Sequence, residues 1–185
     1  KLFELLLTKE QIGHILAVLR KHQIPMVLEG PNYIYVDEKD FADDPYVIYL
    51  RNELGENLKS ITGTAQYEVN KLSAELGNAD VELVRKELGT EFDMIVHEPD
   101  GILEIGQAGH SKASGIERLC ASLGIAKEDT YAFGDSANDV EMLEFVAHGI
   151  AMGNGTDVAK NAAEFVTTDI HKDGIWNGLK HYGLI

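Results

Sequence analysis

Apolar and polar positions follow two different periods in the second half of the chain. Segments with apolar residues at helical spacing alternate with short, continuous apolar runs. We predict helices over 114–123, from Val140 onward, over 157–163 and from Gly174, and strands over 130–134, 149–152 and 165–168. Helices that alternate with strands predict a parallel, doubly wound sheet of the α/β class.

The first half has a more mixed pattern. Thr8 stands where a helix N-cap belongs, and Gln11 stands three residues later in the capping-box position. Apolar residues at 12, 15, 16 and 19 then follow at helical spacing. Short apolar runs predict strands over 25–28, 33–36, 92–96 and 102–105, with turns at 30–32 and 99–101. These elements predict an α+β unit.

Several segments of the first half are harder to assign. Residues 1–7 are typical of the end of a strand, and the acidic segment 37–45 is typical of a loop. Residues 46–50 fit either a strand or the start of a helix, and 67–76 fit neither clearly. Asn78 is a candidate cap for a short helix that carries Val81, Val84 and Leu88. Glycines cluster at 106–109, so we expect domains of 1–108 and 109–185.

Composition and charge narrow the class of protein. The chain has 185 residues, of which 44% are hydrophobic, and a formal charge of −15. An acidic chain without a basic patch argues against nucleic-acid binding but permits a small anionic substrate. No apolar run approaches the roughly 20 residues of a membrane span. The single cysteine, Cys120, excludes an internal disulfide and fits a reducing compartment, so we expect a cytoplasmic protein. The oligomeric state stays open.

The stretch YAFGDSANDVEML, residues 131–143, holds the first candidate chemistry. Asp135 follows a predicted strand directly, at the sheet edge where ligands of α/β proteins bind. Ser136, Asn138 and Asp139 lie on the same loop and at the start of the next helix. Carboxylates in this place suit a hard cation such as Mg²⁺. The alternative is an ordinary capped helix, in which Ser136 or Asn138 is the cap.

Lys112 is the second candidate. It opens a predicted helix, where the helix dipole disfavours a positive charge. A lysine that faces a phosphate or a carboxylate would tolerate this cost, and the alternative is an exposed lysine without a partner. The segment GIAMGNG, residues 149–155, forms a strand and a glycine-rich loop at the same sheet edge. The alternative interpretation of this segment is an ordinary turn between a strand and a helix.

Together these motifs resemble the haloacid dehalogenase superfamily and, within it, the Cof-type sugar phosphatases. The resemblance is carried by HSKASGI (110–116), YAFGDSANDVEML (131–143), IAMGNG (150–155) and EFVTTDIHKDGI (164–175), with GILEI (101–105) as the last strand of a cap. It implies a Rossmann-like core, of which 109–185 is the C-terminal half, and an α+β cap in residues 1–108. The cap would set the choice of substrate.

The resemblance also implies a role for each matching residue. Lys112 would neutralise the nucleophile and the transferring phosphoryl group. Asp135 would be a Mg²⁺ ligand, and Asp139 would support the metal shell directly or through water. Asn138 and Ser136 would lie near the phosphate. The expected reaction is Mg²⁺-dependent hydrolysis of a small phosphorylated metabolite through an aspartyl-phosphate.

One part of the family pattern is missing. The family's first motif is Asp-x-Asp-Gly-Thr, and the sequence contains no such segment; 37–40 lacks both the spacing and the glycine. The second motif is not identifiable. We therefore expect the chain to be the C-terminal portion of a longer polypeptide and to be inactive by itself. A phosphomutase or other phosphoryl transferase, and a binding or regulatory module without a nucleophile, are the alternative functions.

Overall fold

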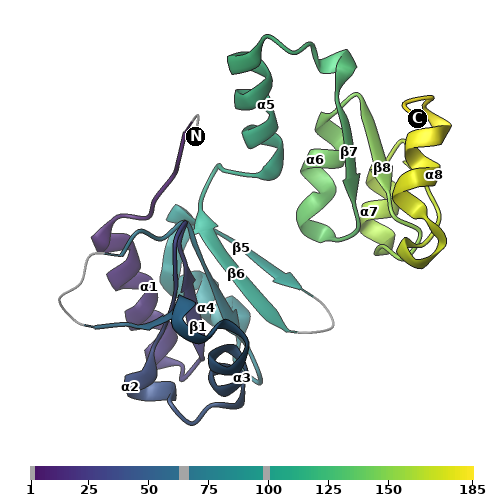
Figure 1. Ribbon diagram of the computed structural model, residues 1–185. Coiled ribbons are helices and arrows are strands. Elements are labelled where there is room, and N and C mark those ends of the chain that lie inside the picture. The colour runs from purple at the N-terminus through teal and green to yellow at the C-terminus, as the bar shows by residue number, and fades with distance from the viewer. Residues whose placement is uncertain (1–2, 63–66, 98–100) are drawn as a thin grey trace. The chain divides into compact units, whose positions relative to one another are not determined.

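The computed structural model describes residues 3–62, 67–97 and 101–185. Its contacts divide the chain into two compact units, residues 3–108 and 109–185. Each unit is described by itself (Figure 1). No helix in the described residues is both long enough and apolar enough to cross a bilayer.

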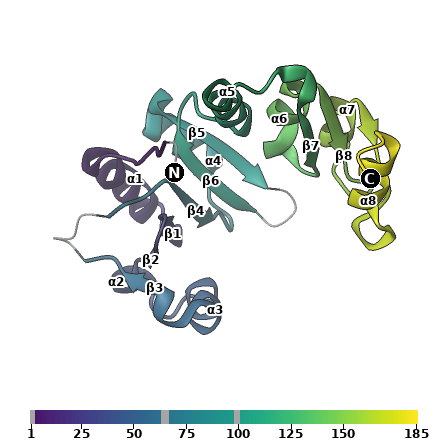
Figure 2. The same ribbon diagram turned by 45° about the horizontal axis from the view of Figure 1, so that its top comes forward.

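The first unit is built around a six-stranded mixed sheet in the order β3-β2-β1-β4-β6-β5. Its strands are β1 Met26–Glu29, β2 Ile34–Val36, β3 Leu58–Ser60, β4 Lys71–Glu75, β5 Phe92–His97 and β6 Ile102–Gln107. Its helices are α1 Lys9–Lys21, α2 Glu38–Phe41, α3 Pro45–Leu54 and α4 Val81–Leu88. All the strand pairs are antiparallel except β2 with β3 (Figure 2).

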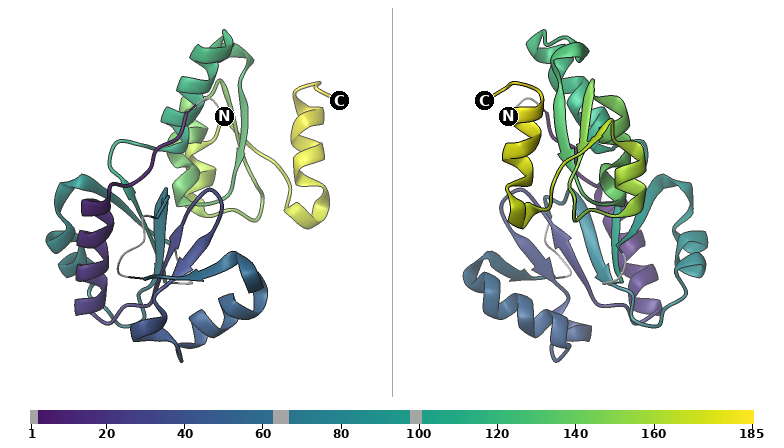
Figure 3. Two further views of the ribbon diagram at one scale, coloured as in Figure 1. Left: turned by 60° about the vertical axis from the view of Figure 1, so that its left-hand side comes forward. Right: turned by 90° about the vertical axis from the view of Figure 1, so that its right-hand side faces the viewer.

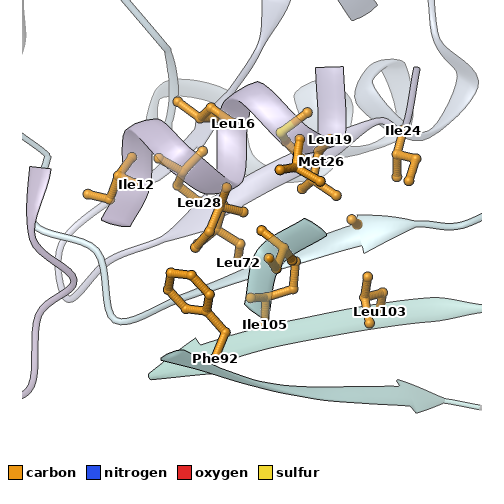
Figure 4. Packing of buried hydrophobic residues seen from close by; sticks show 14 of the residues in the cluster. Ile12, Leu16, Leu19, Ile24, Met26, Leu28, Leu72, Phe92, Leu103 and Ile105 are labelled. Atoms are coloured by element: carbon orange, nitrogen blue, oxygen red, sulfur yellow. The ribbon is translucent and has the colours of Figure 1, made fainter. Parts of the chain in front are cut away.

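The two faces of this sheet are covered differently. Helices α1 and α4 pack over one face, which holds the main apolar core of Leu19, Met26, Leu28, Leu72 and Ile105 (Figure 4). Helix α3 lies on the other face (Figure 3, left). There Val47 packs against Val27 and Val36, next to β2. Because successive side chains of a strand point to opposite faces, Met26 and Leu28 of β1 face the main core and Val27 faces α3.

The helix start at Thr8 confirms the predicted capping box. The Thr8 side chain accepts a hydrogen bond from the Gln11 N–H at 3.1 Å, and the Gln11 side chain accepts one from the Thr8 N–H at 2.9 Å. The ambiguous segment at 46–50 is helical, because Asp44 accepts a bond from the Tyr46 N–H and Pro45 occupies the first turn.

Three local expectations were wrong. Residues 3–7 form no strand, and the segment 37–45 contains the short helix α2. The cap of α4 is Asp80 rather than Asn78, because the Asp80 carboxylate accepts bonds from the N–H groups of residues 82 and 83. Either residue type can cap a helix, and the extended backbone at Asp80 decides between them.

The second unit confirms the predicted parallel sheet. Strands β7 Tyr131–Gly134, β8 His148–Ala151 and β9 Phe165–Val166 pair in parallel in the order β7-β8-β9. The helices are α5 Lys112–Leu123, α6 Val140–Phe145, α7 Asp157–Ala162 and α8 Gly174–His181. Helices α6 and α8 lie on opposite faces of the sheet (Figure 3). This is the layered arrangement of doubly wound α/β folds.

Glycines set how closely these helices approach the sheet. A Cβ on Gly178 of α8 would lie 2.5 Å from the Phe133 ring, and one on Gly149 would lie 2.2 Å from the Leu143 carbonyl oxygen of α6. Neither contact is possible for a larger residue. The absence of side chains at these positions therefore lets both layers close onto the strands.

One side of the second unit is uncovered. Within the described residues, β7 pairs with β8 and no strand pairs with its outer edge. None of the residues of α5 is buried, and its Leu119 and Leu123 are 40% and 57% exposed. An unpaired strand edge and exposed apolar side chains are each features that ordinarily receive a partner.

Candidate active site

The loop after β7 is organised around the carboxylate of Asp139. One oxygen, Oδ2, accepts hydrogen bonds from the main-chain N–H groups of Asp135 at 2.9 Å and Ser136 at 3.2 Å. The residue is only 4% exposed. The carboxylate therefore folds the loop back on itself and holds Asp135 at the carboxyl end of the strand.

Glycine makes room for this buried acid. A Cβ on Gly134 would lie 2.6 Å from the Asp139 Cβ and 3.1 Å from its Oδ2. A Cβ on Gly155 would lie 2.9 Å from the Asp135 carbonyl oxygen. The glycine-rich loop therefore packs against the main chain of the acidic loop, as the predicted positions of both at one sheet edge require.

Lys112 meets the same carboxylate from the start of α5. Its Nζ lies 2.5 Å from Asp139 Oδ1, across a separation of 27 residues in the sequence. The Lys112 side chain remains 49% exposed. An ammonium group has three N–H donors, so two of them remain available for an anion beside the loop. Asp139 therefore holds the Lys112 side chain in one orientation, so Lys112 is not a lysine without a partner.

The charge of Asp139 is stabilised by its neighbours. Burial acts to raise the pKa of the Asp139 carboxyl, but the Lys112 ammonium and the two N–H groups outweigh burial and lower that pKa below its usual value of 3.8. The carboxylate is therefore ionised at neutral pH, and its negative charge keeps Lys112 in place.

Asp135 differs from Asp139 in its surroundings. Its side chain is exposed, and no hydrogen bond or ion pair to its carboxylate is present within the described part of the chain. Its oxygens are thus available to bind a cation, whereas those of Asp139 are engaged. Mg²⁺ keeps several waters and needs only one or two carboxylates. The exposed Asp135 carboxylate is therefore of the chemical type that Mg²⁺ prefers.

Few other metal-binding groups lie nearby. In the described residues, no cluster of three or more His, Cys, Asp or Glu side chains is arranged to hold an ion. Ser136 and Asn138 hold each other, since the Ser136 hydroxyl donates to Asn138 Oδ1 at 2.6 Å. Their role beside a phosphate, and the metal roles of the two aspartates, stay predictions.

Thr156 is a further residue of the site, and it was not among the residues predicted from the sequence. Its N–H donates to the Asp135 carbonyl oxygen at 2.8 Å, its hydroxyl lies 3.3 Å from the same oxygen, and its side chain also caps α7. The signal was present in the sequence, because a threonine directly after GNG and before a helix is a typical N-cap. Thr156 joins the two loops that form the site.

Comparison with known proteins identifies a family. The sequence profile of haloacid dehalogenase-like hydrolases matches residues 1–179. A phosphoglycolate phosphatase of Halobacterium salinarum is 30% identical over 193 residues, covering 88% of this chain and 85% of that protein. The 5-amino-6-(5-phospho-D-ribitylamino)uracil phosphatase YitU of Bacillus subtilis is 36% identical over 138 residues, covering 72% of this chain.

Solved structures share the fold. The subclass IIB sugar phosphatase BT4131 superimposes with a TM-score of 0.82 at 23% identity, over 100% of this chain and 70% of that one. The match to YitU covers 47% of that protein, so the chain spans about half the length of this relative.

Proposed function

Since this chain belongs to the haloacid dehalogenase-like hydrolases, we propose that it carries the charge-stabilising residues of a Mg²⁺-dependent phosphatase. The substrates would be small phosphorylated metabolites such as sugar phosphates. The observation that carries this proposal is the meeting of Lys112, Asp139 and the Asp135 loop. Two segments that are remote in sequence bring the Lys112 ammonium group to the buried Asp139 carboxylate, which also holds the loop that carries the exposed Asp135. An ammonium group together with a cation on Asp135 would suit a phosphoryl group, whose three outer oxygens share its negative charge.

The residues of this chain would act in distinct ways. Lys112 would donate to a phosphoryl oxygen through its remaining N–H groups, while Asp139 keeps its ammonium oriented. Asp135 would bind Mg²⁺, and the bound ion would supply charge neutralisation at the phosphoryl group. Thr156 would hold the Asp135 main chain against movement. Groups that are prearranged in this way lower the barrier because they need no rearrangement during the reaction.

The phosphoryl acceptor is part of the proposal. The sequence has no Asp-x-Asp-Gly-Thr segment, so we propose that the attacking aspartate belongs to a segment outside this sequence. The unit of residues 109–185 would then be the C-terminal half of the core, and residues 3–108 would be the cap. The chain alone would bind phosphate esters without hydrolysing them. A cytoplasmic location stays a prediction from the single cysteine.

The test is phosphate release by the complete polypeptide that contains this chain, with and without Mg²⁺. The Lys112→Met and Asp135→Asn variants should each lose about 100-fold or more in kcat. Lys127→Met and Asp129→Asn are matched controls, because both residues lie before β7, at its opposite end. The controls should keep activity. Equal activity in all four variants would contradict the proposal, and phosphate transfer to a second sugar without release would favour a mutase.

A further inference from the structure

The glycine-rich loop of residues 152–156 lies between two other loops at the same edge of the parallel sheet. On one side, the Thr156 N–H donates to the Asp135 carbonyl oxygen at 2.8 Å. On the other side, the Gly153 N–H donates to the Thr168 carbonyl oxygen at 3.1 Å, in the segment that follows β9. The position of the acidic loop therefore depends on how firmly the middle loop is held.

Two glycines let the middle loop approach both neighbours closely. A Cβ on Gly155 would lie 2.9 Å from the Asp135 carbonyl oxygen, and a Cβ on Gly153 would lie 2.6 Å from the Asp169 main-chain nitrogen. A side chain at either position would push the loops apart. Asn154, between the two glycines, is thus the residue whose side chain has room to make a contact of its own.

The Asn154 side chain fastens the middle loop to the segment after β9. Its Oδ1 accepts a hydrogen bond from the Ile170 N–H at 2.9 Å, across 16 residues of sequence. The turn itself does not require an asparagine. The Gly155 N–H closes the turn onto the Met152 carbonyl oxygen at 2.9 Å, and Asn154 has no left-handed backbone. The bond to Ile170 therefore explains the residue better than the turn does.

The segment that carries Ile170 is itself anchored to α8. The Asn177 side-chain nitrogen donates to the Thr168 hydroxyl oxygen at 2.8 Å and to the Lys172 carbonyl oxygen at 2.9 Å. The Thr168 hydroxyl also donates to the Lys172 carbonyl oxygen at 2.8 Å. These bonds hold the main chain on both sides of Ile170. Asn154 is therefore bonded to a fixed point of the unit.

We propose that Asn154 is a positioning residue for the cation site at Asp135. It holds the middle loop against the anchored segment, so Gly155 and Thr156 stay packed against the Asp135 main chain. Asn154 acts through these contacts and touches neither the cation nor the phosphate ester. A ligand that is held in place before binding loses less freedom when the cation binds, so the affinity for the cation is higher. This inference rests on the proposed phosphatase function.

The test compares Asn154→Leu, which removes the acceptor at nearly the same size, with Asn154→Asp, which keeps an oxygen acceptor. The first readout is amide hydrogen exchange of the complete polypeptide without Mg²⁺. The leucine should speed exchange of the Thr156 N–H about fivefold, because loss of one hydrogen bond favours local opening. The aspartate should restore the slow exchange. The Ile150 N–H of β8 should exchange at an unchanged rate, which separates local positioning from a general loss of stability.

The second readout is the affinity for Mg²⁺, measured by isothermal titration calorimetry on the same polypeptide. Asn154→Leu should weaken Mg²⁺ binding about threefold or more, and Asn154→Asp should bind Mg²⁺ at least as tightly as wild type. The KM for a sugar phosphate should change by less than about twofold in Asn154→Leu, because Asn154 does not contact the substrate. Asn161→Leu is the matched control, because Asn161 is an exposed asparagine of α7 in the same unit. It should leave all three readouts unchanged.

Several results would overturn the inference. One is equal protection of the Thr156 N–H in wild type and Asn154→Leu, and another is an unchanged affinity for Mg²⁺. Exchange that is accelerated equally at Ile150 would assign Asn154 a purely structural role. If Asn154→Leu does not fold by circular dichroism, Asn154→Ala, which also lacks the acceptor, decides. Failure of the phosphatase proposal is separable, because it would abolish phosphate release by the wild type, whereas exchange and calorimetry need no turnover.

Discussion

Replacing Asp139 by asparagine tests the central claim that this acid holds the site together. The carboxylate accepts two main-chain N–H bonds and one lysine bond. An asparagine oxygen can keep the two N–H bonds, but its NH₂ group then faces the Lys112 ammonium. Bonds to charged groups contribute about 1.5–3 kcal/mol each. The half-exposed lysine recovers part of this loss from water. We therefore expect Asp139→Asn to lower the free energy of unfolding by about 2 kcal/mol.

The assay is urea unfolding followed by tryptophan fluorescence. The chain has a single tryptophan, Trp176, and it lies in α8 of the same unit as Asp139. For an m value of about 1 kcal/mol/M, a 2 kcal/mol loss moves the midpoint by about 2 M. Asp135→Asn is the matched control, because its exposed carboxylate lies on the same loop. It should change stability by less than about 0.5 kcal/mol.

The effect should depend on pH in one direction. The folded-state pKa of Asp139 is lowered, so its stabilisation is complete above the unfolded-state pKa and is lost as pH falls through the folded-state pKa. The difference between wild type and Asp139→Asn should therefore shrink as pH falls below about 4. Equal losses in the two variants, or a difference that grows in acid, would refute the argument.

Three further changes test other parts of the structure. Gly134→Ala should cost about 1–3 kcal/mol in the same urea titration, because its Cβ would press on the buried acid; no change would exclude that close contact. Arg20→Met should cost about 3–5 kcal/mol by removing the 2.5 Å partner of the fully buried Asp37 carboxylate. Adding Asp37→Asn should recover part of that loss, and no recovery would exclude the pair as its source. Burial and Glu164 raise the pKa of Tyr182 to about 12, so Glu164→Gln should lower it in an ultraviolet titration; an unchanged value would assign the shift to burial alone.

Local signals and chain order made much of the fold predictable. The Thr8 capping box lies within four residues, so the sequence contains all of it. The alternation of helices and strands in the second half implies parallel strands, whose carboxyl ends must share one edge. That rule alone predicts that Asp135 and the 152–156 loop lie together, as they do.

The sequence did not predict which of the two aspartates is buried and which is exposed. Asp135 and Asp139 are both acids on one loop, and the spacing of four residues does not say which is buried. The answer depends on the absence of a Cβ at Gly134 and on the reach of Lys112 from α5. Such contacts depend on how the helices and strands pack together. The periodic pattern of apolar residues gives no information about that packing. The five-residue run at 46–50 was ambiguous for a similar reason, because it is too short to separate the two periods.

The order of the parallel strands has a consequence for access to the acids. They follow β7, an outer strand, so the glycine loop after β8 screens them on one flank only. Within the described residues the opposite flank has no neighbouring strand. The outer edge of β7 therefore has main-chain groups that are open to pairing with a further strand. The electrostatic apparatus is therefore held together by contacts made within this unit alone.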